Sequence, residues 1–220
     1  MTALDFVIQD NAVVVAMDTL SLRAVDHKPY KMVTKFMPIP HMNSLICGTG
    51  NMGAIIDWFS WVEKNVIANG IYQLDKITRQ VIKEFMQKHN GDNSCTIYQF
   101  GLHEIDGKFH GYAYRSANDF ESEEIQQGMA VKPPDAFLTS DGTMDLSSYM
   151  SEGSTMQEIL SNIMHRQKEY DDNLNIDDRL GIGGIIQIVI LSKDKITIEN
   201  YKYFDDFEST YIEMLKNLND

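Results

Sequence analysis

The sequence predicts an α+β fold in which two antiparallel sheets stack face to face between helical layers, a four-layer α-β-β-α sandwich. Three observations lead to this prediction. Strand-like and helical segments come in blocks, in the order strands, two helices, strands, helix, strands. Neighbouring strands are joined by short polar turns, which is typical of antiparallel hairpins. The two central helices carry their apolar residues on one face, as expected of helices that cover a sheet.

The first block of strands occupies residues 2–48. The run Gln9-Asp10-Asn11 separates two segments rich in Val, Ile and Phe and suits a tight turn, so these segments are predicted to pair antiparallel. Residues 26–30 are predicted to form a loop, and the run Pro38-Ile39-Pro40-His41 is predicted to end the third strand. The predicted strands of this block are 2–8, 12–18, 31–37 and 44–48.

The two helices that follow, 50–68 and 73–89, have apolar residues at three- and four-residue steps, and an Asn-Gly pair follows each. The dipeptide Asp106-Gly107 indicates a hairpin between two further strands. The acidic run 121–124 is predicted to be exposed, the run 131–153 predicts no element, and the acidic pairs of 171–184 are interpreted as a solvated connection. The remaining predicted elements are strands 95–105, 109–115, 185–191 and 196–203 and helices 155–170 and 209–218.

Composition narrows the class of protein. A chain of 220 residues and 25.1 kDa is predicted to form a single domain, 1–220. Its net charge of −13 argues against nucleic acid as a partner, because phosphate binding requires a basic face. No apolar run approaches the length of about 18 residues that a membrane helix requires.

Cysteine and histidine usage adds two expectations. The two cysteines, Cys47 and Cys95, are too few for a disulfide framework and predict buried free thiols in a cytoplasmic protein. The six histidines show no metal-binding spacing, so neither a metal nor a cofactor is predicted.

Three residues of the first block combine into a minimal set of groups for acyl transfer. Thr2 directly follows Met1, Asp18 ends the second predicted strand, and Lys35 lies on the third. If Met1 is removed, Thr2 carries both a hydroxyl nucleophile and a free amine. The α-amine, with a pKa of about 7.7–8, is partly neutral at cellular pH and can accept the hydroxyl proton.

This pattern resembles the proteasome β-subunit and HslV-like group of N-terminal nucleophile (Ntn) hydrolases. The separation of Thr2 and Asp18 and the dipeptide Asp18-Thr19 are similar to that family's signature, and Lys35 is similar to its lysine. The segment 47–50 before a helix resembles the family's glycine turn, and the pair 183–184 resembles its late Gly-Gly. The resemblance covers most of the chain in element order, but its specific motifs lie within residues 1–50.

The resemblance implies a function. Thr2 would be the nucleophile and base of a threonine-type hydrolase that cleaves peptide or other amide bonds. Lys35 would stabilise the nucleophile as an ammonium held by Asp18, and a backbone N–H of Gly48 or Gly50 would serve as oxyanion donor. The resemblance also implies a ring of identical chains whose active sites face a chamber. It does not decide whether the ring has a partner ATPase.

The sequence differs from the family pattern at two places, so a function other than hydrolysis is also considered. Leu20 replaces the arginine that usually follows the Asp-Thr pair, and the late motif over 178–184 lacks its hydroxyl residue. A retained Met1 would turn the Thr2 amine into an amide that cannot act as a base. A non-catalytic, ring-forming or binding member of the same fold is therefore the alternative to an enzyme.

A dinucleotide-binding oxidoreductase is a weaker alternative. The run 48–53 reads G-x-G-x-x-G between a short strand and a helix, which matches the dinucleotide-binding fingerprint. Asp75 lies at the distance of the acidic residue that this motif requires. The surrounding order of elements, however, is not the βαβ alternation of that fold.

Overall fold

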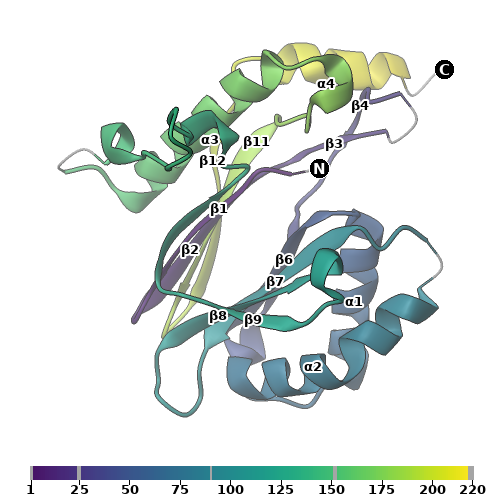
Figure 1. Cartoon of the computed structure of the whole chain (residues 1–220), viewed down its shortest axis with the longest axis vertical. Coiled ribbons are helices and arrows are strands. Elements are labelled where there is room, and N and C mark those ends of the chain that lie inside the picture. Colours follow the sequence, from purple (N-terminus) through teal and green to yellow (C-terminus); the bar gives the residue numbers. More distant parts are fainter. Residues whose placement is uncertain (1, 24–25, 90, 151–152, 218–220) are drawn as a thin grey trace.

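Two five-stranded antiparallel sheets form the centre of the molecule (Figure 1). The computed structural model describes residues 2–23, 26–89, 91–150 and 153–217. The first sheet contains, in spatial order, β10 (Gly128–Lys132), β1 (Leu4–Gln9), β2 (Ala12–Asp18), β11 (Ile185–Ser192) and β12 (Ile196–Tyr203). The second sheet contains β5 (Phe36–Ile39), β6 (Ser44–Gly50), β7 (Cys95–Leu102), β8 (Phe109–Arg115) and β9 (Ser122–Ile125). Two short strands, β3 (Leu20–Leu22) and β4 (Pro29–Met32), pair separately.

The two sheets share an apolar core. Alternate residues of β1 point to the second sheet, because side chains of a strand alternate between its faces. Phe6 thus packs against Tyr98 and Phe100 of β7 with tilted rings, whose centroids lie 5.8 and 4.9 Å from that of Phe6. The neighbouring Val7 belongs instead to the cluster on the opposite face, with residues of α3 (Met156–Asp172). The sequence therefore supplies both faces of the first sheet with apolar side chains.

Helices cover the outer face of each sheet (Figure 1). Helices α1 (Met52–Asn65) and α2 (Ile71–Lys88) pack on the second sheet around the fully buried Trp58. Helix α3 begins at a capping box in which Thr155 and Glu158 satisfy each other's backbone N–H groups, and it packs on the first sheet. Helix α4 (Phe207–Asn217) follows β12 and contacts β4. The prediction of an α+β fold with antiparallel sheets is confirmed. None of the helices within the described residues is long and apolar enough to cross a bilayer.

Five strands differ from the prediction, the first of which, β3, was not predicted at all. The expected single strand 31–37 is wrong, because β4 ends at Met32 and β5 begins only at Phe36. Pro38 does not end β5, since β5 is an edge strand where a missing N–H is tolerated. The acidic run 121–124 mostly forms β9, another edge strand. The prediction also missed β10, which ends inside the run 131–153 for which no element was predicted. Short polar edge strands bury few side chains and so leave little hydrophobic pattern. The last residue of the predicted closing helix, Leu218, lies outside the described residues.

The dinucleotide-binding arrangement is not formed. Gly48 and Gly50 belong to β6, and every strand pairing within the described residues is antiparallel, whereas the fingerprint requires a parallel βαβ unit. Asp75 is buried on α2, where its carboxylate accepts hydrogen bonds from Tyr114 Oη at 2.7 Å and Ser122 Oγ at 2.6 Å. It therefore anchors α2 to the second sheet.

Candidate active site

The start of β1 and the end of β2 are joined through the carboxylate of Asp18. The strands pair with Leu4 opposite Met17, which places Asp18 beside Ala3. Asp18 Oδ1 accepts hydrogen bonds from Ala3 N at 3.1 Å and from Lys35 Nζ at 2.9 Å, and Oδ2 accepts one from Gly183 N at 3.3 Å. One carboxylate thus holds the chain next to Thr2, the lysine and the segment before β11.

The Asp18–Lys35 ion pair is almost completely buried, with side-chain exposures of 0% and 2%. Burial raises the pKa of Asp18 and lowers the pKa of Lys35, because each charge loses hydration. Each partner opposes the shift of the other, and the backbone N–H donors of Gly183 and Ala3 also favour the carboxylate form of Asp18. Since desolvation is the largest contribution to both shifts, the pKa values of Asp18 and Lys35 lie closer together than those of a solvent-exposed pair.

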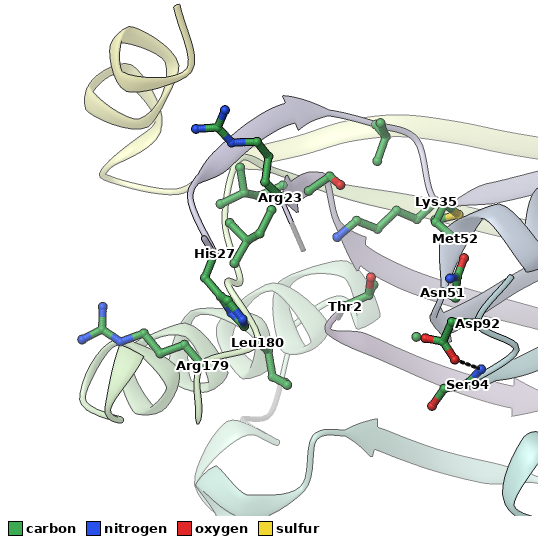
Figure 2. Close-up of a pocket in the computed structure, with 15 residues that line it drawn as sticks. Thr2, Arg23, His27, Lys35, Asn51, Met52, Asp92, Ser94, Arg179 and Leu180 are labelled. Carbon is green, nitrogen blue, oxygen red and sulfur yellow. Dashed lines mark hydrogen bonds between the residues drawn. The ribbon is translucent and has the colours of Figure 1, made fainter. Parts of the chain in front are cut away.

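Thr2 lies between two cavities. The first, about 480 Å³, is bordered by Thr2, Lys35 and Gly50, and Figure 2 shows the Lys35 side chain extending toward Thr2. The second, about 490 Å³, also includes Thr2 and Gly50. Volumes of this size are typical of sites for small molecules or side chains. The structure therefore brings three of the five predicted site residues, Thr2, Lys35 and Gly50, to one cavity, with Asp18 directly behind Lys35.

Basic side chains border both cavities. Arg23 and Arg179 contribute to the first, together with Asp92, whose carboxylate accepts a hydrogen bond from Ser94 N at 2.8 Å (Figure 2). Lys132 and Arg115 contribute to the second cavity. Burial and the neighbouring Arg115 lower the pKa of Lys132. Both cavities thus present cations to a bound molecule in a chain of strongly negative net charge.

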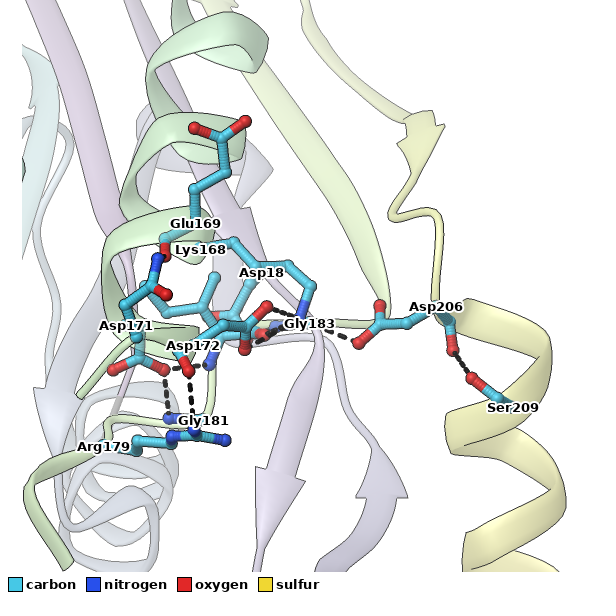
Figure 3. Close-up of polar contacts among 12 residues, drawn as sticks. Asp18, Lys168, Glu169, Asp171, Asp172, Arg179, Gly181, Gly183, Asp206 and Ser209 are labelled. Carbon is cyan, nitrogen blue, oxygen red and sulfur yellow. Dashed lines mark hydrogen bonds and ion pairs between the residues drawn. The ribbon is translucent and has the colours of Figure 1, made fainter. Parts of the chain in front are cut away.

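The segment before β11 is held in place by Asp171 and Lys168 (Figure 3). Asp171, which is buried, accepts hydrogen bonds from the backbone N–H groups of Leu180 and Gly181 at 2.7 and 2.9 Å. Lys168 Nζ donates to Ile182 O at 3.2 Å and pairs with Asp206 at 2.8 Å. These contacts fix Leu180 at both cavities and Gly183 against Asp18.

The interpretation of the acidic pairs as solvated is wrong for Asp171, although Asp178 is exposed as expected. Sequence reasoning missed Asp171 because its partners lie nine to eleven residues further along the chain. Its position at the end of a predicted helix, before a glycine-rich run, is the one signal that could have indicated a carboxylate bound to loop N–H groups.

The two glycines proposed as oxyanion donors occupy different places. Gly50 has φ = +95° and borders both cavities. Gly48 lies further inside β6, where a Cβ atom would lie 2.5 Å from Thr96 O and 2.7 Å from Ile55 Cδ1. Gly48 does not border either of the two described cavities that Thr2 shares. Gly50, rather than Gly48, therefore borders the space that the two cavities offer.

Replacing Gly50 with alanine is expected to destabilise the protein by more than about 2 kcal/mol, because the new Cβ would lie 2.3 Å from Ser94 O in a backbone conformation that already disfavours alanine. Gly142→Ala is the matched control, since Gly142 has φ = +80° and an open surrounding. Denaturant unfolding of both variants separates the clash from the backbone strain. Equal losses of stability in the two variants would contradict the expected steric clash between the new Cβ and Ser94 O.

Comparisons with known proteins concern the fold. No protein-family model matches the sequence, and no curated protein matches it either. Among solved structures, a mutant of Anbu from Hyphomicrobium sp. strain MC1 matches with a TM-score of 0.66 at 12% identity, covering 100% of this chain and 95% of that chain. The fold resembles that of Anbu. A second similar structure, Anbu from Yersinia bercovieri, described as an ancestral β-subunit, has a TM-score of 0.61 at 10% identity and covers 99% of this chain and 93% of that one.

These comparisons correct the predicted family. Membership of the proteasome β-subunit and HslV-like group is wrong as stated, because no family model supports it and the structural likeness is to Anbu. What the chains share is the fold, over nearly the whole length of each. At 10–12% identity the likeness concerns the fold alone, and the chemistry has to be argued from this chain's own residues.

Proposed function

We propose that this chain is an N-terminal threonine hydrolase that cleaves peptide or other amide bonds after removal of Met1, and that its sheets and helices form the four-layer α-β-β-α sandwich of Ntn hydrolases. The observation that carries the proposal is the buried Asp18–Lys35 pair at the cavity bordered by Thr2. A buried ion pair contributes little net stability and is costly to desolvate. Its position at a cavity that Thr2 also borders supports a chemical role.

In the proposed reaction the α-amine of Thr2 accepts the proton of its own Oγ1 as the oxygen attacks the substrate carbonyl carbon. The Lys35 ammonium stabilises the developing charge on Oγ1, and Asp18 holds the ammonium in place. A backbone N–H near Gly50 would stabilise the oxyanion, in accordance with its position at the cavity.

The tetrahedral intermediate then collapses. The scissile C–N bond breaks, the α-ammonium gives its proton to the leaving amine, and an ester remains on Thr2 Oγ1. A water molecule, activated by the same amine, hydrolyses this ester and restores the hydroxyl. No cofactor takes part in this sequence of steps. The residues proposed for the site are thus Thr2, Asp18, Lys35 and Gly50, with Gly48 as the less favoured donor.

Assembly belongs to the same proposal. The similar Yersinia protein is described as a β-subunit, which supports association of several copies of this chain, with a ring of identical chains as the expected form. The substrate, a partner ATPase, the single-domain organisation and the cytoplasmic location stay predictions. If the chain does not react, the same fold would serve as a non-catalytic assembly or binding component.

The mass of the intact protein tests the proposal directly. An epoxyketone reacts with both the hydroxyl and the free amine of an N-terminal threonine, so we expect loss of one methionine and a single stoichiometric adduct. Thr2→Ala should show no adduct, whereas Thr197→Val on β12 should react like the wild type. Protein that has lost Met1, is folded and still forms no adduct would overturn the proposed chemistry. Retention of Met1 after expression with excess methionine aminopeptidase would overturn the required processing.

A further inference from the structure

A cluster of two histidines and one carboxylate lies at the β7–β8 hairpin and plays no part in the proposed reaction. His103 follows β7, Asp106 lies in the turn, and His110 is on β8. One ligand atom of each lies within 4.8 Å of those of the other two. Among the described residues this is the one group of three or more His, Cys, Asp or Glu side chains with such spacing.

Both ring nitrogens of His110 face carboxylates. Nδ1 lies 2.9 Å from Glu124 Oε1, and Nε2 lies 3.0 Å from Asp106 Oδ2. A neutral imidazole carries one N–H, so when Nδ1 donates to Glu124 the lone pair of Nε2 faces the lone pairs of Asp106. A cation between Nε2 and Asp106 would remove this repulsion, because both groups would then bind the cation. The Glu124–His110 contact then has the form of the carboxylate–histidine pair that orients metal ligands.

His103 supplies a second nitrogen without a hydrogen bond. Its Nδ1 is buried, makes no hydrogen bond and lies 3.3 Å from Asp106 Oδ1. The ring is held by contact with Tyr72, at a centroid distance of 5.1 Å, and with His110 at 4.4 Å. A buried nitrogen without a hydrogen bond is costly, and a metal ion between it and Asp106 would satisfy it.

We propose that His103, Asp106 and His110 bind a divalent transition-metal ion of the Zn²⁺ type. Ligands at about 2.0–2.2 Å from such an ion lie about 2.8–3.6 Å from one another, the shorter separations in octahedral and the longer in tetrahedral arrangements. The separations of 3.3 and 3.0 Å between the histidine nitrogens and the Asp106 oxygens fall in this range. Two imidazoles and a carboxylate favour zinc and its neighbours over the oxygen-preferring Mg²⁺ and Ca²⁺.

The site is structural because it lies far from the two cavities. Cys95 at the start of β7 borders the second cavity, whereas His103 follows the other end of this eight-residue strand, about 25 Å away. The hairpin also contacts the β1–β2 turn, where Lys108 Nζ lies 2.9 Å from Asp10 Oδ2. A bound ion would therefore join the two strands and the turn of the hairpin, and would stiffen the hairpin where it contacts the β1–β2 turn.

Zinc titration of the metal-free full-length protein, followed by calorimetry, tests the site. We expect one Zn²⁺ per chain and at least tenfold weaker binding for His103→Gln and for His110→Gln. Glu124→Gln, which removes an orienting partner, should weaken binding by about tenfold to a hundredfold without abolishing it. His41→Gln, which changes an exposed histidine outside the cluster, should bind as tightly as the wild type.

Thermal unfolding provides a second measurement. At a zinc concentration a hundred times the Kd, the melting temperature of the wild type should rise by about 5 to 10 °C, and that of His103→Gln/His110→Gln should not. The melting temperatures of the metal-free variants show whether they fold. Absence of saturable zinc binding by the wild type, or unchanged binding by the folded double variant, would overturn the proposal.

Discussion

Replacing Lys35 with methionine is expected to lower the free energy of unfolding by about 3 to 5 kcal/mol at neutral pH, because it leaves the Asp18 carboxylate buried without a cation. Under the proposed function it also abolishes hydrolysis and adduct formation at Thr2. Denaturant unfolding gives the stability loss, and intact mass gives the loss of reaction. Lys195→Met, on the exposed β11–β12 turn, is the matched control and should change neither.

A double-mutant cycle separates the structural role of the pair from its chemical role. Asp18→Asn keeps a side-chain oxygen for the N–H of Ala3 and removes the buried charge, so Asp18→Asn/Lys35→Met should be more stable than Lys35→Met alone. The double variant should nevertheless form no adduct, since the ammonium is absent. The stability deficit of Lys35→Met should also shrink as the pH falls, because burial raises the pKa of Asp18 and favours its protonated form. Additive losses of stability, independent of pH, would contradict a coupled buried pair.

The parts of the site that the sequence could predict are those fixed by local pairing. A two-residue turn between β1 and β2 sets the register Leu4–Met17, so a carboxylate at the end of β2 must lie beside the start of β1. Lys35 was predicted as a site residue on a strand, and the structure places it in the short connection before β5. Its burial against Asp18 depends on how β5 packs, which periodicity does not reveal.

The remaining parts depend on contacts between residues far apart in the chain. The metal cluster was missed because His103 and His110 are seven residues apart and meet only through the hairpin, where Gly101 pairs with His110. Asp171 was missed because its loop partners belong to no regular element. Asp5, inside an apolar strand, was treated as an ordinary strand residue, although its surroundings include Gln167 of α3 and Lys132 of β10. Tertiary packing decides the role of such polar residues.

Replacing Asp5 with asparagine is expected to stabilise the protein more at pH 8 than at pH 5. The gap between variant and wild type (the free energy of unfolding of the variant minus that of the wild type) should increase by about 3 to 4 kcal/mol between these two pH values. Asp5 is completely buried, and its Oδ1 accepts hydrogen bonds from Gln167 Nε2 at 2.9 Å and Lys132 N at 3.2 Å. Its Oδ2 has no hydrogen-bond partner within the described structure. Burial raises the pKa of Asp5 from 3.8 to about 8, and the Asp18 carboxylate adds to the rise, against the hydrogen bonds from Gln167 and Lys132 N that lower it.

The sign follows from the proton that Asp5 holds in the folded state. The unfolded chain releases this proton above about pH 4, whereas the folded protein retains it to about pH 8. Wild-type stability therefore falls by about 1.4 kcal/mol per pH unit between these values from this group alone. Asparagine keeps the acceptor oxygen and cannot ionise, so the variant lacks that decline. Guanidinium unfolding at pH 5 and pH 8 measures the gap, with Asp194→Asn on the exposed β11–β12 turn as control. A gap that is the same at both pH values would mean that Asp5 is ionised in the folded protein, and that a compensating partner stabilises its charge.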